Sequence, residues 1–133
     1  MSERYVRQTV LSEVGPAGQA KLAAASVLVV GAGGLGCPVV QYLAGAGVGR
    51  LAIVDHDTVE ETNLHRQPLY AMADIGKPKA AVAAAVVQRF NPDIAVAAVV
   101  ERLTPQNAAT LTNDRSTIIC STPVSRSRAR ARA

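Results

Sequence analysis

The sequence predicts an α/β fold built on a doubly wound, mostly parallel sheet. Two observations carry this prediction: four short apolar runs alternate with stretches of helical character, and a glycine-rich turn separates the first run from the helix after it. The chain has 133 residues, of which 49% are hydrophobic. That length and composition allow one domain with a core of its own and exclude a wholly disordered chain.

Residues 1–25 are predicted to form an N-terminal helical segment. A short helix over 2–11 begins at Ser2, whose side chain is a good N-cap. The glycines and the proline of 15–18 break the helical pattern, and 19–24 add one or two further turns. We therefore expect two short helices before the first strand of the sheet.

Residues 26–122 are predicted to form the sheet and its helices. The apolar runs are rich in β-branched residues, which is typical of strands buried on both faces of a parallel sheet. Glycine or proline stands at several of the expected helix ends, where it starts or stops a helix. The expected order is a strand at 27–30, a helix at 38–46, a strand at 51–54, an irregular polar segment at 57–75, a helix at 78–90, a strand at 94–100, a helix from Thr104 to Leu111 and a strand at 117–120.

Charge is distributed unevenly along the chain. The net charge of +4 equals the number of arginines in residues 123–133, a stretch that contains no acidic residue. Without these four arginines, the 14 Lys and Arg fall to 10 and match the 10 Asp and Glu, so residues 1–122 are neutral overall. We expect the arginine-rich stretch to be a disordered tail, and a basic face for specific nucleic-acid binding is not indicated.

Other broad classes of protein are also disfavoured. No apolar run approaches the roughly 18 residues of a membrane-spanning helix, and the N-terminus lacks the apolar stretch of a secretory signal. Cys37 and Cys120 form neither a CxxC pair nor a disulfide framework, so no zinc site is predicted. Cys37 is expected to pack within a helix and Cys120 within a strand. A reducing cytoplasm is the expected compartment.

A G-x-G-x-x-G motif, Gly-Ala-Gly-Gly-Leu-Gly, lies directly after the first predicted strand and before a predicted helix. Its glycines allow a tight turn and bring backbone N–H groups to a phosphate at the helix N-terminus. The candidate nucleotide-binding residues here are Gly31, Gly33, Gly34 and Gly36. Asp55 ends the second predicted strand 19 residues after Gly36, where a carboxylate accepts hydrogen bonds from ribose hydroxyls. This pattern alone fits NAD and ATP equally well.

Cationic and amide side chains after the second strand favour a triphosphate over a dinucleotide. Arg66 can place its planar guanidinium on phosphate oxygens, and Lys79 can act there as a point charge. Asn63 can hydrogen-bond an oxygen without adding charge. Each of these residues alone is also typical of a solvated loop, so the interpretation depends on their combination. Asp57 in the same segment either supports such a site or is a solvated loop charge.

Five motifs in this order resemble the MoeB/ThiF/HesA family, whose members are similar to the adenylation domain of ubiquitin-activating enzymes. The motifs span roughly residues 4–120 and are Arg4-Tyr5-Val6-Arg7-Gln8, the glycine motif, Asp55-His56-Asp57-Thr58-Val59, Asn63-Leu64-His65-Arg66-Gln67 and Gly76-Lys77-Pro78-Lys79. The resemblance implies a Rossmann-like sheet that binds ATP and Mg²⁺. It also implies a homodimer that adenylates the C-terminal glycine carboxylate of a ubiquitin-like sulfur-carrier protein and releases pyrophosphate.

The resemblance implies roles for individual residues as well. Asp55 would bind the ribose of ATP. The phosphates and the transferring α-phosphoryl group would be held by Asn63, Arg66 and Lys79. Arg7 would reach across the dimer interface to the partner's ATP, as an arginine finger does. The expected catalytic residues are therefore Arg66, Lys79 and Arg7.

The chain departs from the family pattern after its fourth predicted strand. The resemblance implies a metal-binding aspartate two residues after Cys120, but Thr122 stands there, and a neutral hydroxyl cannot replace a carboxylate on Mg²⁺. No metal-binding residue is therefore assigned. The rest of the family's sheet and its CxxC zinc pairs are missing, which implies a truncated domain with weak or no activity by itself.

Three functions remain open on the sequence alone. The first is an ATP-dependent adenylyltransferase for a ubiquitin-like sulfur carrier. The second is an NAD(P)-binding oxidoreductase domain, which only the glycine motif and Asp55 support. The third is a non-catalytic nucleotide-binding fragment, which Thr122 and the missing half favour. We prefer the adenylyltransferase family as the identity and expect little activity from this chain alone.

Overall fold

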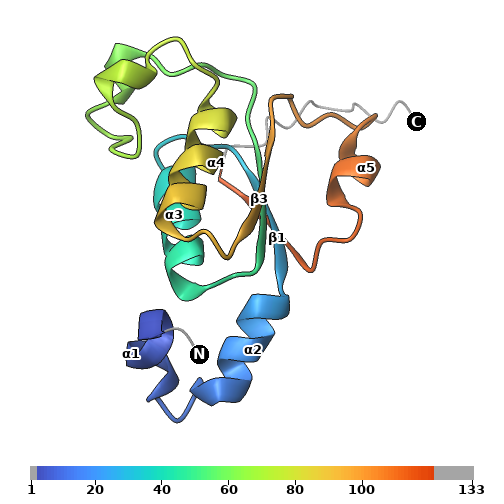
Figure 1. Ribbon diagram of the computed structural model, residues 1–133. Coiled ribbons are helices and arrows are strands. Elements are labelled where there is room, and N and C mark those ends of the chain that lie inside the picture. The colour runs from blue at the N-terminus through green and yellow to red at the C-terminus, as the bar shows by residue number, and fades with distance from the viewer. Residues whose placement is uncertain (1–2, 122–133) are drawn as a thin grey trace.

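The computed structural model describes residues 3–121, whose strands form one sheet with every pair of neighbours parallel. The strands are β1 (Ser26–Val30), β2 (Arg50–Val54), β3 (Ala95–Val99) and β4 (Thr117–Cys120). They lie side by side in the order β3-β2-β1-β4 (Figure 1). The predicted α/β fold with a parallel sheet is therefore confirmed. The predicted tail at 123–133 lies outside the described residues.

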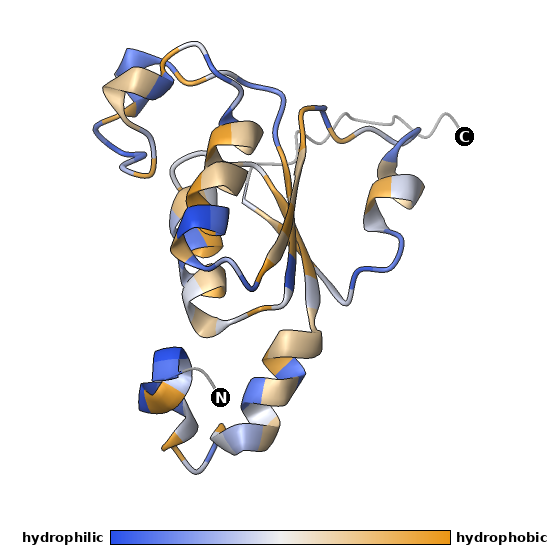
Figure 2. Cartoon of the chain, in the orientation of Figure 1, coloured by the Kyte–Doolittle hydropathy of each residue, from blue (hydrophilic) through white to orange (hydrophobic). Residues whose placement is uncertain are grey.

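The two central strands are the most buried part of the sheet. Every residue of β1 and the last four residues of β2 are buried. One face of these strands packs against α3 (Gly36–Ala46) and α4 (Lys79–Phe90), and the other faces α5 (Ala108–Thr112) (Figure 1). Hydrophobic residues are concentrated along the strands (Figure 2). The continuous apolar runs in the sequence therefore reflect burial on both faces.

The outer strands are more exposed than the central ones. Within the described part of the chain, β3 pairs with β2 alone and β4 pairs with β1 alone. No residue of either outer strand is buried. Their apolar runs resemble those of the central strands, although the structure places them at the two edges. An exposed strand edge favours pairing with other chains.

The first predicted helix is shorter in the structure than in the prediction. It consists of a 3-10 turn (Glu3–Tyr5) followed by α1 (Val6–Thr9). Ser2, the predicted N-cap, lies outside the described residues. The N-terminal helix is therefore a little less than two turns long.

The predicted break at 15–18 is wrong, because α2 (Gly15–Ala24) begins there. Gly15 has a φ of +56°, which favours glycine, and so turns the chain into the helix. Pro16 fits the first helical turn, since its missing N–H needs no partner at that place.

Within the described part of the chain, no helix is both long and apolar enough to pass through a lipid bilayer.

Two later helices also begin at residues other than those predicted. α3 begins at Gly36, two residues before the expected start at Pro38. α5 begins at Ala108, because a turn separates it from Thr104. In this turn the Asn107 N–H donates to Thr104 Oγ1 at 3.3 Å, and the Thr104 N–H donates to Asn107 Oδ1 at 2.8 Å. The hydroxyl of Thr104 thus accepts an N–H within this turn and does not cap α5.

The N-terminal helices α1 and α2 pack at the end of the sheet opposite the glycine-rich motif (Figure 1). Asn91 is fully buried after α4, and its Nδ2 donates to Tyr5 Oη at 2.7 Å. Gln8 Nε2 donates to the carbonyl oxygen of Ala46, the last residue of α3, at 2.8 Å. These bonds hold α1 against the C-terminal ends of α3 and α4.

Substitution of Gly49 by alanine is expected to destabilise the fold, because a Cβ there would overlap the backbone of Ala23 in α2. We expect the free energy of unfolding, measured by urea denaturation, to fall by about 1–3 kcal/mol. Gly45→Ala is the matched control, since a Cβ at that position in α3 meets no described atom within 4 Å. This variant should be unchanged or up to about 1 kcal/mol more stable. Equal stability of the two variants would contradict the close packing at Gly49.

Candidate functional site

The glycine-rich loop follows β1 at the carboxyl end of the sheet. Gly31 has a φ of +95°, which favours glycine, and its N–H donates to Val54 O at 2.8 Å. At Gly36 a Cβ would overlap the Gly31 carbonyl oxygen and would lie 2.8 Å from Ser121 Oγ. Only glycine therefore allows so tight a turn from β1 into α3. In the first turn of α3 the Cys37 N–H donates to Gly33 O at 3.0 Å and Pro38 has no N–H, so the backbone donors that remain for a ligand among the described residues are those of the loop from Gly33 to Gly36.

Asp55 connects the loops that follow β1 and β2. Its buried carboxylate accepts the Ala32 N–H on Oδ2 and the Asp57 N–H on Oδ1, both at 2.7 Å. The carbonyl oxygen of Asp57 in turn accepts the Lys79 N–H at 3.0 Å. One carboxylate thus fixes the glycine-rich loop, the chain after β2 and, through Asp57, the start of α4. Each carboxylate oxygen has a further lone pair for a ligand hydroxyl.

The polar segment between β2 and α4 is a loop closed at its base. The Val59 N–H donates to Lys77 O at 2.9 Å, and the Gly76 N–H donates to Val59 O at 2.8 Å. Thr58 pairs with Pro78 in an isolated antiparallel bridge beside these bonds. The segment between them, which we call the polar loop, therefore has fixed ends and extends beyond the carboxyl end of the sheet (Figure 1).

Two side chains of the polar loop reach the glycine-rich loop. Arg66 Nη1 lies 3.7 Å from the place where a Cβ of Gly34 would stand. Gln67 Nε2 lies 3.7 Å from the corresponding place at Gly33. The structure therefore brings Arg66, a predicted phosphate-binding residue, to the predicted nucleotide loop. Gln67 was not among the predicted site residues.

Asn63 and Lys79 are both buried, but only the side chain of Asn63 is hydrogen-bonded. Asn63 ends a 3-10 turn (Glu61–Asn63), and its Oδ1 accepts the Glu60 N–H at 3.1 Å. Lys79, the first residue of α4, is 6% exposed, and its Nζ makes no hydrogen bond or salt bridge to any residue in 3–121. Its Nζ is not among the buried side-chain atoms that lack a partner, so the ammonium reaches solvent and is accessible to an anion. The arrangement therefore suits an anionic ligand.

Cys37 and Tyr70 lie on the inner side of the glycine-rich loop. Tyr70 Oη donates to Ala32 O at 2.6 Å, and Cys37 Sγ donates to the same oxygen at 3.4 Å. Burial raises the pKa of the Cys37 thiol, and the Tyr70 hydrogen bond and the charge of Lys79 offset only part of this effect. Burial also raises the pKa of Tyr70, with a further contribution from Cys37. Both side chains are therefore neutral at physiological pH.

Arg7 is not part of this cluster. It is an exposed residue of α1, which packs at the opposite end of the sheet from the glycine-rich loop (Figure 1). Within one chain, the structure therefore separates Arg7 from Arg66 and Lys79, the other two predicted catalytic residues. A role for Arg7 at a nucleotide requires a second chain.

Ser121 is a site residue that the sequence analysis missed. It follows β4, and its Oγ lies 2.9 Å from Val30 O and 2.7 Å from Gly31 O. The hydroxyl shares its proton between these two carbonyl oxygens and ties the end of β4 to the start of the glycine-rich loop. Its position directly after a predicted strand was the available signal, because parallel strands end at one edge of the sheet.

Asp55, His56 and Asp57 have ligand atoms within 4.8 Å of one another, a spacing that suits a metal ion. However, Arg102 Nη2 lies 2.9 Å from His56 Nε2, and that nitrogen is also 3.2 Å from Asp57 Oδ1. A guanidinium at this place repels a cation. The cluster as arranged does not fit a metal ion. Thr122, at the implied metal position, lies outside the described residues.

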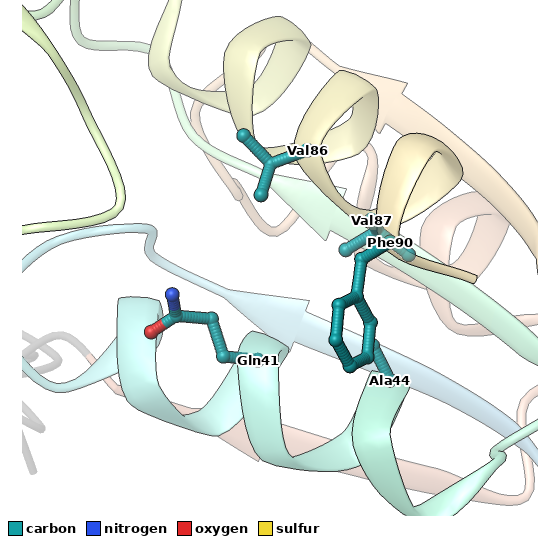
Figure 3. A pocket seen from close by; sticks show the side chains of 5 residues that line it. All are labelled: Gln41, Ala44, Val86, Val87 and Phe90. Atoms are coloured by element: carbon teal, nitrogen blue, oxygen red, sulfur yellow. The ribbon is translucent and has the colours of Figure 1, made fainter. Parts of the chain in front are cut away.

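A small apolar pocket between α3 and α4 is separate from the glycine-rich loop. It is lined by Gln41, Ala44, Val86, Val87 and Phe90 (Figure 3). Figure 3 shows the Phe90 ring extending from α4 toward Ala44 of α3. Both residues lie near the C-terminal ends of their helices, and the lining contains no charged group. The pocket therefore does not suit a phosphate.

Comparison with known proteins shows what the chain is similar to. A model of the ThiF family matches residues 5–128. The sulfur carrier protein adenylyltransferase of Thermus thermophilus is 57% identical over 106 residues, which are 80% of this chain and 39% of that protein. The SAMP-activating enzyme E1 of Haloferax volcanii is 50% identical over 105 residues, which are 79% of this chain and 39% of that protein.

The chain is also similar to solved structures. The structure of E. coli tRNA N6-threonylcarbamoyladenosine dehydratase, TcdA, in complex with ATP superposes with a TM-score of 0.84 at 30% sequence identity. The superposition covers 90% of this chain and 49% of TcdA. The chain therefore spans less than half the length of each of these three relatives.

The two cysteines are expected to differ in their reaction with iodoacetamide. Cys120 is exposed in β4, whereas Cys37 is buried and has a raised thiol pKa. Mass spectrometry at neutral pH should show rapid labelling of Cys120 and labelling of Cys37 only after unfolding. Cys120→Ser is the control and should contain no rapidly reacting thiol. Rapid labelling of Cys37 in the folded chain would contradict its burial.

Proposed function

The chain belongs to the ThiF family, and on that premise we propose that it is the ATP-binding portion of an adenylyltransferase. The observation that carries the proposal is Lys79 at the start of α4, whose Nζ makes no hydrogen bond or salt bridge to any described residue and whose charge acts on Cys37 in the first turn of α3. Arg66 adds a second cation over Gly34. A helix N-terminus with two cations favours a polyphosphate, and ATP carries more phosphate charge than NAD(P) carries in its pyrophosphate bridge.

The proposed binding mode places ATP along the glycine-rich loop. The backbone N–H groups from Gly33 to Gly36 bind phosphate oxygens, since none of them donates to a described residue. The glycines that allow this approach are Gly31, Gly33, Gly34 and Gly36. Asp55 accepts hydrogen bonds from the ribose hydroxyls with the lone pairs that its two backbone contacts leave available. Asp57 contributes through its backbone, which positions Lys79.

The proposed reaction is attack of a carboxylate on the α-phosphorus of ATP. A carboxylate oxygen of the C-terminal glycine of a ubiquitin-like sulfur carrier forms the new P–O bond, and the bond from phosphorus to the pyrophosphate oxygen breaks. Arg66 and Lys79 stabilise the charge on the phosphoryl oxygens. Asn63 donates from Nδ2, because its Oδ1 is used within the polar loop. Mg²⁺ carried in by ATP would supply further positive charge, and no residue of this chain is assigned to hold it.

The carrier protein, the second subunit and the compartment are also parts of the proposal. The carrier is supported by the names of relatives, of which the chain spans 39%. A homodimer is supported by the position of Arg7 in an exposed helix far from its own glycine-rich loop (Figure 1). In such a dimer, Arg7 acts on the partner's ATP. A cytoplasmic location is supported by the two unpaired cysteines.

The chain is expected to bind ATP and to lose affinity when Arg66 is removed. Arg66→Ala deletes charge-assisted hydrogen bonds to phosphate, so the binding free energy in calorimetry should weaken by roughly 1.5–3 kcal/mol. Arg89→Ala is the matched control, because it removes an exposed arginine in the last turn of α4 and should leave ATP binding unchanged. An unaltered dissociation constant for Arg66→Ala would exclude Arg66 from the site. Tight binding of NADH without binding of ATP would favour an oxidoreductase domain instead.

Pyrophosphate exchange by this chain alone is expected to be weak or absent. Thr122 offers no carboxylate for Mg²⁺, and the chain spans 39% of the Thermus thermophilus adenylyltransferase. The assay follows labelled pyrophosphate into ATP with Mg²⁺ and a carrier that ends in Gly-Gly, and a full-length relative is the positive control. ATP binding without exchange would identify this chain as a non-catalytic nucleotide-binding fragment. Robust exchange would refute that interpretation.

A further inference from the structure

Gln67 carries a buried carboxamide whose oxygen finds no partner in the part of the chain that the structure describes. The residue is 1% exposed, and its Oε1 has no hydrogen-bond partner among the described residues. Its Nε2 is not among the buried atoms that lack a partner, so it reaches solvent, and it lies 3.7 Å from the place where a Cβ of Gly33 would stand. Buried polar groups in folded proteins are nearly always paired, so this carboxamide requires a specific explanation.

The backbone holds Gln67 in a defined place. Its N–H donates to Asn63 O at 3.0 Å, and its carbonyl oxygen accepts the Tyr70 N–H at 3.1 Å. Tyr70 is itself fixed to the glycine-rich loop, because its Oη donates to Ala32 O at 2.6 Å. Hydrogen bonds to Asn63 and to Tyr70 thus hold the backbone of Gln67, and its carboxamide stays against the glycine-rich loop.

The surroundings of this carboxamide are those of the proposed phosphate site. The guanidinium of Arg66 lies beside Gly34, and the carboxamide of Gln67 lies beside Gly33. Two consecutive residues of the polar loop therefore place polar side chains next to two consecutive glycines. A carboxamide nitrogen has two N–H donors and no charge. It can therefore donate to a phosphate oxygen without the repulsion that a third cation would meet from Arg66 and Lys79.

We propose that Gln67 is a further nucleotide-binding residue, whose Nε2 donates a hydrogen bond to a phosphate oxygen of ATP held over Gly33. The inference rests on the proposed ATP site. The competing role for Gln67 is to fill space beneath the glycine-rich loop. A space-filling side chain affects all nucleosides and nucleotides equally, whereas a phosphate ligand affects only those that carry phosphate.

Gln67→Met separates the two roles, because methionine has a similar length but no carboxamide. In calorimetry, the affinity for ATP should fall roughly tenfold, while the affinity for adenosine should change by less than about twofold. The thermal midpoint of the ligand-free chain should not fall, since the substitution removes a buried polar group without a partner. Gln41→Met, at an exposed position of α3, is the matched control and should alter neither affinity. Equal losses for ATP and adenosine, or a lower thermal midpoint, would overturn the proposal.

A measurement on the unaltered chain covers the case in which the variant does not fold. In a ¹⁵N NMR titration, ATP should shift the Nε2 resonance of Gln67, and adenosine should leave it in place. A resonance that stays unmoved at saturating ATP would overturn the role of Gln67 and leave the ATP site intact. A chain that binds no ATP at all would overturn both the proposed function and this inference.

Discussion

The site depends above all on the two backbone hydrogen bonds that the Asp55 carboxylate accepts. One comes from Ala32 in the glycine-rich loop and the other from Asp57 after β2. Asp57 continues the connection by accepting the backbone N–H of Lys79 at the start of α4. Parallel strands bring these three segments to one edge of the sheet. The carboxylate then fixes their spacing, so a single side chain determines where the loop amides and the lysine stand relative to each other.

The same carboxylate explains why the site needs positive charge. Asp55 is buried, so water screens its negative charge poorly, and a polyphosphate bound nearby is repelled. Arg66 over Gly34 and Lys79 at the start of α4 oppose this repulsion. In the ligand-free chain the buried Lys79 has no hydrogen bond or salt bridge to any described residue. The protein therefore keeps its charges in place before a ligand arrives, which lowers the cost of reorganisation on binding.

The sequence predicts all four strands to within one residue at each end. In β1 and β2 the continuous apolar run reflects burial on both faces, whereas β3 and β4 carry similar runs although they are exposed at the edges. The glycine-rich loop is predictable for a related reason, since a turn without room for a Cβ leaves a glycine at each tight position. The prediction of a break at 15–18 fails because glycine and proline are common both where a helix begins and where one is interrupted. The burial of Gln67 and the contacts of Ser121 depend on segments far apart in the sequence, and the sequence signal for Ser121 is limited to its position directly after a strand.

The polar loop between β2 and α4 is joined to itself at its base, where Val59 is hydrogen-bonded to both Lys77 and Gly76. These bonds hold the two ends of the loop together, so each doubling of its length adds only about 0.6 kcal/mol to the entropy cost of closing it. The loop is nevertheless part of the core, because Val59, Leu69 and Tyr70 pack in the same buried cluster as β1 and β2. Insertions in its exposed part therefore cost little, whereas changes at these three residues disturb the packing under the sheet.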